Sequence, residues 1–153
     1  MEVFRIVKAE YAGELFASGR ANRWNYTGEK VLYTAASRSL ACLENLVHAS
    51  GEILGEQFTI MVIYIPDDLS VTSVQPTGLP DDWFQRARHP ACQAVGSDWF
   101  QAQETPLLKV PSAIMHREFN YVLNTQHSDY EKIQLIDKQS FAFDPRLKQN
   151  QFE

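Results

Sequence analysis

The sequence lacks the features by which membrane, secreted and metal-binding proteins are usually recognised. Its longest apolar run, residues 58–65, is far shorter than the ~20 residues that a membrane-spanning helix needs. The first residues carry neither the basic nor the apolar segment of a secretory signal peptide. Cysteine is scarce: Cys42 and Cys92 stand at a spacing typical of neither a metal site nor a redox motif. We expect a cytoplasmic protein with two free thiols and no membrane association, although the sequence leaves a disulfide between them open.

The sequence also has little positive charge and no glycine-rich loop of a known binding type. Fourteen Lys and Arg residues against nineteen Asp and Glu residues give a net charge of −5. A protein that binds nucleic acid by itself needs the opposite balance, because it must displace counterions from phosphates. The chain has no phosphate-cradling loop and no nucleophilic serine elbow. Its histidines are scattered without the spacing of metal ligands, so no metal site is expected.

The residues that are present predict an ordinary globular domain. The length of 153 residues and the 44% hydrophobic fraction are typical of one domain, which we expect to span residues 1–153. Strands are expected at 3–7, 31–34, 58–65, 107–110, 119–124, 132–136 and 141–143. Helices are expected at 10–19, ended by Gly19, at 38–49, and over most of 80–103 with interruptions at 89–90 and 96. Because these elements follow no regular βαβ order, the predicted class is α+β.

The helix at 38–49 is the most clearly patterned element. Ser37 is a suitable N-cap, and residues 50–51 end the helix. At 100° per residue, one apolar stripe is expected to face the core; it consists of Leu40, Leu43, Leu46 and Val47. The segment 58–65 has the continuous apolar character of a strand buried on both faces, and 124–130 is expected to be a loop.

Four polar residues occupy positions where chemistry and ordinary structure are both possible. Arg23, in a polar loop beside a tryptophan, can hold a phosphate or simply lie over the indole ring. Glu44 borders the apolar stripe, where an unpaired carboxylate is costly, and can pair with His48 one turn later. Tyr33 can be a half-buried strand residue, and Ser112, just after a proline, can be a turn or N-cap residue. Taken singly, each has an adequate structural explanation.

Taken together, the strings around these residues resemble the RES-domain family, which is named for its Arg, Glu and Ser positions. The strings occur in the family's order at 23–25, 31–35, 43–48, 108–114 and 120–124, and both ends of the chain are similar as well. One position departs from the family pattern, because Asn22 stands where a glycine usually precedes the Arg-Trp pair. Asparagine tolerates a positive φ better than most residues, so the loop is expected to survive this change.

The resemblance implies the toxin of a bacterial type II toxin–antitoxin pair. Such a toxin has a fold similar to ADP-ribosyltransferase toxins, with central mixed and antiparallel sheets and flanking helices. It takes NAD+ as a substrate and needs no other cofactor. Its partner is an antitoxin with a helix-turn-helix of the Xre type, which binds the toxin, covers its active site and represses the operon. DNA binding then belongs to the partner, and homo-oligomers within the complex are expected.

The resemblance also implies catalytic roles for Glu44, Arg23 and Tyr33. Glu44 would bind a ribose hydroxyl and stabilise the oxocarbenium-like state that forms as nicotinamide leaves. Arg23 would hold the pyrophosphate, and Tyr33 would stack on or orient the nicotinamide ribose. Substrate binding is further expected from Ser112, which would meet the nicotinamide amide or the ribose, and from three supporting residues: Asn120, His48 and Arg5.

The sequence leaves the acceptor of the reaction open. Hydrolysis or phosphorolysis of NAD+ is the leading hypothesis, and transfer of ADP-ribose to a protein uses the same site. An inert antitoxin-binding module is a second class of alternative, although it has no need of intact Arg23, Tyr33, Glu44 and Ser112. A ribonuclease has little support, because neither a histidine pair nor a basic groove is apparent.

Overall fold

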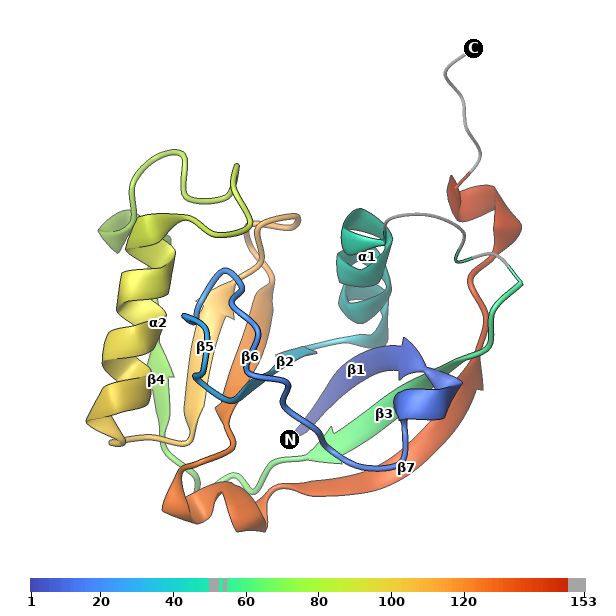
Figure 1. Ribbon diagram of the computed structural model, residues 1–153, viewed down its shortest axis with the longest axis horizontal. Coiled ribbons are helices and arrows are strands. Elements are labelled where there is room, and N and C mark those ends of the chain that lie inside the picture. The colour runs from blue at the N-terminus through green and yellow to red at the C-terminus, as the bar shows by residue number, and fades with distance from the viewer. Residues whose placement is uncertain (50–52, 54, 149–153) are drawn as a thin grey trace.

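The computed structural model describes residues 1–49, 53 and 55–148, and these form one seven-stranded mixed sheet with two α-helices (Figure 1). The strands are β1 (Glu2–Lys8), β2 (Val31–Ala35), β3 (Phe58–Tyr64), β4 (Val71–Ser73), β5 (Leu107–Pro111), β6 (Phe119–Asn124) and β7 (Gln134–Phe141). Their order is β4-β5-β6-β2-β1-β3-β7; β4 and β5 are parallel, and the other pairs are antiparallel. The predicted α+β class is confirmed.

The sheet is nearly divided in its middle, between β1 and β2. These two strands are paired at Phe4 and Ala35, whereas β1 stays in register with β3 from Glu2 to Lys8. The strands β4-β5-β6-β2 therefore form one half and β1-β3-β7 the other, as Figure 1 shows. A division of this kind leaves backbone groups and side chains accessible between the halves.

Helix α1 (Arg38–His48) confirms the predicted helix and its N-cap, whereas the predicted stop at residues 50–51 lies outside the described residues. The Ser37 hydroxyl accepts a hydrogen bond from the Leu40 amide at 3.1 Å. The predicted apolar stripe is wrong at one end, because Val47 is 63% exposed. The face that packs on β1 and β3 keeps Leu40 and Leu46 of the predicted stripe and also includes Ala41, Cys42 and Ala49. A stripe counted from leucine and valine alone misses the small residues that let the helix lie close to the sheet.

Helix α2 (Pro90–Ala102) is shorter than predicted at one end and more continuous in its middle. Residues 80–89 form turns rather than a helix, and Pro90 occupies the first turn with His89 as the N-cap. The helix continues through Gly96, where an interruption was expected. A Cβ at this position would overlap the backbone carbonyl of Trp24. The glycine therefore permits close contact between α2 and the loop that contains Trp24.

Two further predictions are wrong. Of residues 10–19, only Tyr11 and Glu10 belong to a regular element, the 3₁₀ turn Ala9–Tyr11, and Gly19 has a positive φ of 75° without ending a helix. Tyr11 and Phe16 are 65% and 66% exposed, so the apolar residues of this segment do not share a buried helical face. The predicted strands at 132–136 and 141–143 are replaced by the single strand β7, which pairs with β3 from end to end apart from a β-bulge at Ile136.

Both helices lie on the same face of the sheet. Helix α1 packs on the β1-β3-β7 half, around Phe4, Ile6 and Ile60, and α2 packs with Trp24 on β5 and β6. Among the described residues, the opposite face, with Leu32 and Ile63 at its centre, is covered by loop segments and the short 3₁₀ helix Ser128–Lys132 rather than by an α-helix. The described helices include none that is long and apolar enough to span a membrane. The arrangement leaves space between α1, the Trp24 loop and the division in the sheet.

Candidate functional site

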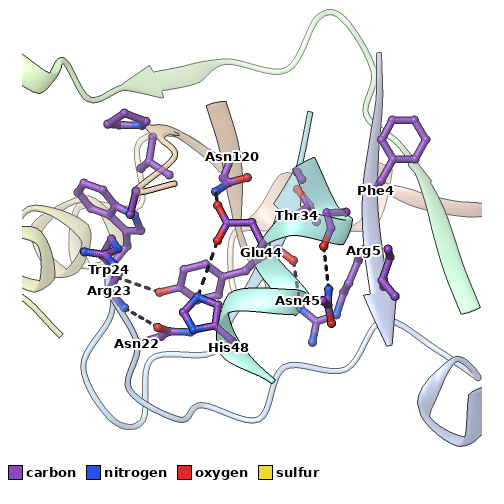
Figure 2. Close-up of a pocket in the computed structure, with 17 residues that line it drawn as sticks. Phe4, Arg5, Asn22, Arg23, Trp24, Thr34, Glu44, Asn45, His48 and Asn120 are labelled. Atoms are coloured by element: carbon purple, nitrogen blue, oxygen red, sulfur yellow. Dashed lines mark hydrogen bonds and ion pairs between the residues drawn. The ribbon is translucent and has the colours of Figure 1, made fainter. Parts of the chain in front are cut away.

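That space is a pocket of about 270 Å³. Its wall is formed by β1 and β2, α1, the loop that contains Trp24, the end of β5 and the start of β6 (Figure 2). Six of the seven residues predicted for the site line it: Arg5, Arg23, Tyr33, Glu44, His48 and Asn120. Ser112 is fully buried and lies behind the wall.

Strand pairing explains why residues so distant in the sequence meet here. Asn120 on β6 is paired with Ala35 on β2, just before α1 begins, and with Val110 on β5, just before Ser112. The Ser112 amide continues this ladder by donating to the Glu118 carbonyl at 2.9 Å. The register of three strands thus places Ser112 and Asn120 beside the first turns of α1, where Glu44 projects.

Glu44 is held by donors on one of its two carboxylate oxygens. Its Oε1 accepts hydrogen bonds from Asn120 Nδ2 at 2.7 Å and from Ser112 Oγ at 2.9 Å. Its Oε2 lies 3.7 Å from the His48 Nε2, and the side chain remains 21% exposed. Burial by itself raises the pKa of Glu44, but His48, Asn120 and Ser112 together outweigh it and hold the pKa below the ordinary 4.5. The carboxylate is therefore ionised at neutral pH.

The two donors to Glu44 are themselves fixed. Ser112 Oγ also accepts from the Ile114 and Met115 amides, each at 3.1 Å, so its proton is free for Glu44. Because a carboxylate only accepts, the Asn120 amide must turn its NH₂ toward Glu44. Its Oδ1 is then buried and has no partner among the described residues. Ser112 donates to Glu44 from outside the pocket, whereas Asn120 donates to Glu44 and also lines the pocket.

Arg23 is anchored to a segment distant in sequence. Its Nη1 donates to the carbonyls of Trp83 and Arg86 at 2.7 Å each, and its Nη2 to the carbonyl of Phe84 at 3.5 Å. The guanidinium carbon also lies 5.8 Å from the centre of the Trp83 ring. Burial lowers the pKa of Arg23 below its usual range. These carbonyls point at Arg23 instead of forming helical bonds, which explains the turns at residues 83–86.

Tyr33 joins the sheet to the Arg23 loop. Its hydroxyl donates to Asn25 Oδ1 at 2.6 Å and accepts from the Trp24 amide at 3.0 Å, while its ring lines the pocket. Burial raises the pKa of Tyr33 well above its usual range, so the hydroxyl stays protonated. Asn22 does not need a positive φ here; its Oδ1 accepts from the Arg23 amide at 2.9 Å.

Arg5 enters the pocket where the sheet divides. Its Nη1 donates to the Tyr33 carbonyl at 3.2 Å, a carbonyl left free because β1 and β2 separate beyond Phe4. Burial lowers the pKa of Arg5. Figure 2 shows Glu44 between Asn120 and His48, with Arg23 on one side and Arg5 on the other. An ionised carboxylate thus lies in one pocket with two guanidinium groups.

Sequence reasoning missed the residues that hold the loop. Asn25 is fully buried and donates to the carbonyls of Arg20, Tyr26 and Glu29. Glu29 is buried as well, although a carboxylate in a turn-rich segment is usually solvated. The one available signal was the pair Trp24 and Tyr26 in a polar loop. Two aromatic residues indicate that the loop packs on the fold, but not which of its polar residues become buried.

Metal chemistry has no obvious site in the part of the chain that the structure describes. No three His, Cys, Asp or Glu side chains gather there in a group that could hold an ion. Cys42 and Cys92 are both free thiols, and Cys92 is buried beside the Trp83 carbonyl.

Comparison with known proteins places the chain in a family. The profile of the RES domain matches residues 2–144. A Yersinia enterocolitica protein named Toxin Res is 32% identical over 153 residues, covering 97% of this chain and 100% of that protein. A Sphingobium protein named Prs ADP-ribosylating toxin is 35% identical over 127 residues, covering 82% of this chain and 79% of that protein.

A solved structure supports the same assignment at the level of the fold. A chain in the crystal structure of the M. tuberculosis MbcT-MbcA toxin-antitoxin complex superposes with a TM-score of 0.77 at 21% identity, covering 92% of this chain and 84% of that one. The RES profile and the Yersinia relative both extend over nearly the whole sequence. The chain therefore belongs to the RES-domain family.

Proposed function

We propose that this protein is the toxin of a toxin–antitoxin pair and that it cleaves NAD+ at the bond between nicotinamide and ribose. The observation that carries the proposal is the ionised carboxylate of Glu44, whose Oε1 is occupied by Ser112 and Asn120. Its Oε2 has only the His48 imidazole nearby among the described residues, at 3.7 Å, and remains able to accept a ribose hydroxyl. A carboxylate fixed in this way is suited to stabilising a developing positive charge.

The proposed reaction needs little acid catalysis. The bond from ribose C1′ to the nicotinamide nitrogen breaks, and its electron pair stays on that nitrogen, whose positive charge disappears. The ribose becomes oxocarbenium-like, and the Glu44 carboxylate stabilises it. A water oxygen then bonds to C1′ and loses a proton to solvent, so NAD+ and water give nicotinamide, ADP-ribose and a proton. Inorganic phosphate in place of water would bond to the same C1′ and give ADP-ribose phosphorylated at that carbon.

The size and charge of the pocket support a substrate that extends beyond it. At about 270 Å³ the pocket is at the small end of ligand sites, so the nicotinamide riboside half of NAD+ is the part we place inside. Arg5 and Arg23 line the wall, and their charges would favour the pyrophosphate. The Tyr33 ring would pack against the ribose, and Ser112 would act through Glu44 rather than by touching nicotinamide.

The names of similar proteins support the biological part of the proposal. Two relatives are named toxins, and the structural neighbour is a chain of a toxin-antitoxin complex. We propose an antitoxin partner of the Xre helix-turn-helix type and a homo-oligomeric toxin within the complex. The net charge of −5 agrees with leaving DNA contacts to that partner.

Protein ADP-ribosylation is a second candidate, because the Sphingobium relative is named an ADP-ribosylating toxin. It uses the same departure of nicotinamide, but a protein side chain replaces water as the acceptor. The deciding condition is whether water reaches C1′ while the substrate is bound.

The test is incubation of purified, antitoxin-free protein with NAD+ alone, with and without inorganic phosphate. Nicotinamide and the ADP-ribose product are separated by chromatography, and an identically purified Glu44→Gln variant controls for contaminating enzymes. Stoichiometric release of nicotinamide and ADP-ribose supports hydrolysis, and a phosphorylated product supports phosphorolysis. Turnover that appears only with a protein acceptor supports transfer. No turnover under any of these conditions, from folded protein, contradicts the proposed function.

A further inference from the structure

Glu29 is a buried carboxylate outside the pocket. The residue is 7% exposed and is absent from the pocket wall. Its Oε2 accepts from the Tyr26 amide at 2.8 Å, and its Oε1 accepts from the side chains of Ser97 and of Gln101, the latter at 3.3 Å. The ion pairs of the described residues give it no cation. Burying a carboxylate without a cation carries a desolvation penalty. We therefore expect the hydrogen bonds of this carboxylate to have a structural role.

This role is at the contact between α2 and the loop of residues 20–30, which precedes β2. Ser97 and Gln101 are four residues apart on α2, and Gln93 lies one turn earlier on the same face. The Gln93 side chain donates to the carbonyls of Asn22 and Asn25, at 3.2 Å each. One face of the helix therefore holds both the start of the loop, through Gln93, and its end, through Glu29.

One position on that helical face carries no side chain. Gly96 lies between Gln93 and Ser97, and a Cβ there would overlap the Trp24 carbonyl. The loop backbone consequently rests directly on the helix backbone. On either side of this contact, hydrogen bonds hold the loop on α2. Gln93 bonds the start of the loop, and Glu29 bonds α2 from its end.

A chain of hydrogen bonds connects Glu29 to the pocket wall. The backbone carbonyl of Glu29 accepts a hydrogen bond from Asn25 Nδ2 at 3.3 Å, and Asn25 Oδ1 accepts one from the Tyr33 hydroxyl. The same hydroxyl accepts from the amide of Trp24, which follows Arg23 and lines the pocket. Displacing the Glu29 end of the loop would therefore move the segment that presents Arg23.

We infer that Glu29 is a positioning residue, whose buried carboxylate fixes the loop of residues 20–30 on α2 and so sets the place of Arg23 in the pocket. The inference rests on the proposed function for its kinetic consequence. If Arg23 binds the pyrophosphate in the ground state and the transition state alike, a displaced loop raises KM and leaves kcat nearly unchanged.

The test compares Glu29→Gln with Glu14→Gln, which removes the same charge from an exposed site. Glutamine preserves the shape, but one of the two acceptor oxygens becomes an NH₂ donor, so the present hydrogen bonds from Tyr26, Ser97 and Gln101 cannot all be kept. We expect KM for NAD+ to rise about 10-fold in Glu29→Gln, with kcat within about 3-fold of wild type, as for the loss of one charged hydrogen bond. Glu14→Gln should match wild type.

A second measurement does not depend on activity. Amide hydrogen exchange at Tyr26 and Trp24 should accelerate about 10-fold or more in Glu29→Gln, while exchange in β3 stays unchanged. Ser97→Ala, which removes one donor to Glu29, should accelerate the same exchange to a smaller extent. It replaces Glu29→Gln in the test if that variant does not fold. Unchanged exchange at both amides overturns the inference, as does a fall in kcat without a rise in KM. Absence of NAD+ turnover in wild type refutes the proposed function, and the exchange data then still decide the role of Glu29.

Discussion

Removing the Ser112 hydroxyl tests how the protein keeps Glu44 ionised. Ser112→Ala takes away one of the two donors to Glu44 Oε1 without altering the pocket wall. A hydrogen bond to a charged group contributes about 1.5–3 kcal/mol, and one unit of pKa corresponds to about 1.36 kcal/mol. The pKa of Glu44 should therefore rise from its present position below 4.5.

The direction of the pH effect follows from which form is active. In the proposed reaction Glu44 acts as the carboxylate, so activity should be lost as the pH falls through its pKa, and a raised pKa should move this loss to higher pH. We expect the acid limb of kcat/KM for NAD+, measured from about pH 4 to 8, to move to higher pH in Ser112→Ala. Near pH 8 Glu44 is ionised in both proteins, so the rate there should fall much less.

A matched control separates this effect from general destabilisation. Ser112→Ala also leaves the Ile114 and Met115 amides without their acceptor, so the free energy of unfolding should fall by about 2 kcal/mol. Ser37→Ala removes the cap of α1, the helix that carries Glu44, and should cost about 1 kcal/mol without touching the carboxylate. An unchanged acid limb in Ser112→Ala, or an equal shift in Ser37→Ala, would refute the reasoning.

Two further substitutions test the contacts of the Arg23 loop. Gly96→Ala places a Cβ against the Trp24 carbonyl, and we expect it to destabilise the fold by about 1–3 kcal/mol and to raise KM for NAD+, measured by urea unfolding and initial rates. Wild-type values of both would show that the loop tolerates displacement. Tyr33→Phe keeps the ring but strands the Trp24 amide and Asn25 Oδ1, which should cost about 1–3 kcal/mol of unfolding free energy. A neutral effect on stability would contradict the role given to this hydroxyl.

Local sequence patterns were sufficient for elements whose structure is decided locally. The polar residue Ser37 before an amphipathic stretch identified α1, and the apolar run at 58–65 identified β3, whose members contribute to the cores on both faces. The turns at 80–89 were not predictable, because their carbonyls serve the guanidinium of Arg23, about 60 residues away. The continuity of α2 through Gly96 likewise depends on contact with a distant loop.

The site was predictable as a set of residues but not as an arrangement. The family resemblance selected Glu44, Ser112 and Asn120, and the structure brings all three within hydrogen-bond distance. It did not show that Ser112 lies behind Glu44, since that depends on the register of β5 and β6. Nor could it identify Glu29, because the burial of one carboxylate follows from how α2 packs on the loop.

The central claim is that the ionised carboxylate of Glu44 stabilises the departure of nicotinamide. Its most direct test is the single-turnover rate of nicotinamide release from NAD+ by wild type and by Glu44→Gln, which keeps the shape but removes the charge. The account predicts a loss of about 10²–10³-fold or more in Glu44→Gln, with ADP-ribose binding largely retained. Release at the wild-type rate from folded Glu44→Gln would contradict it.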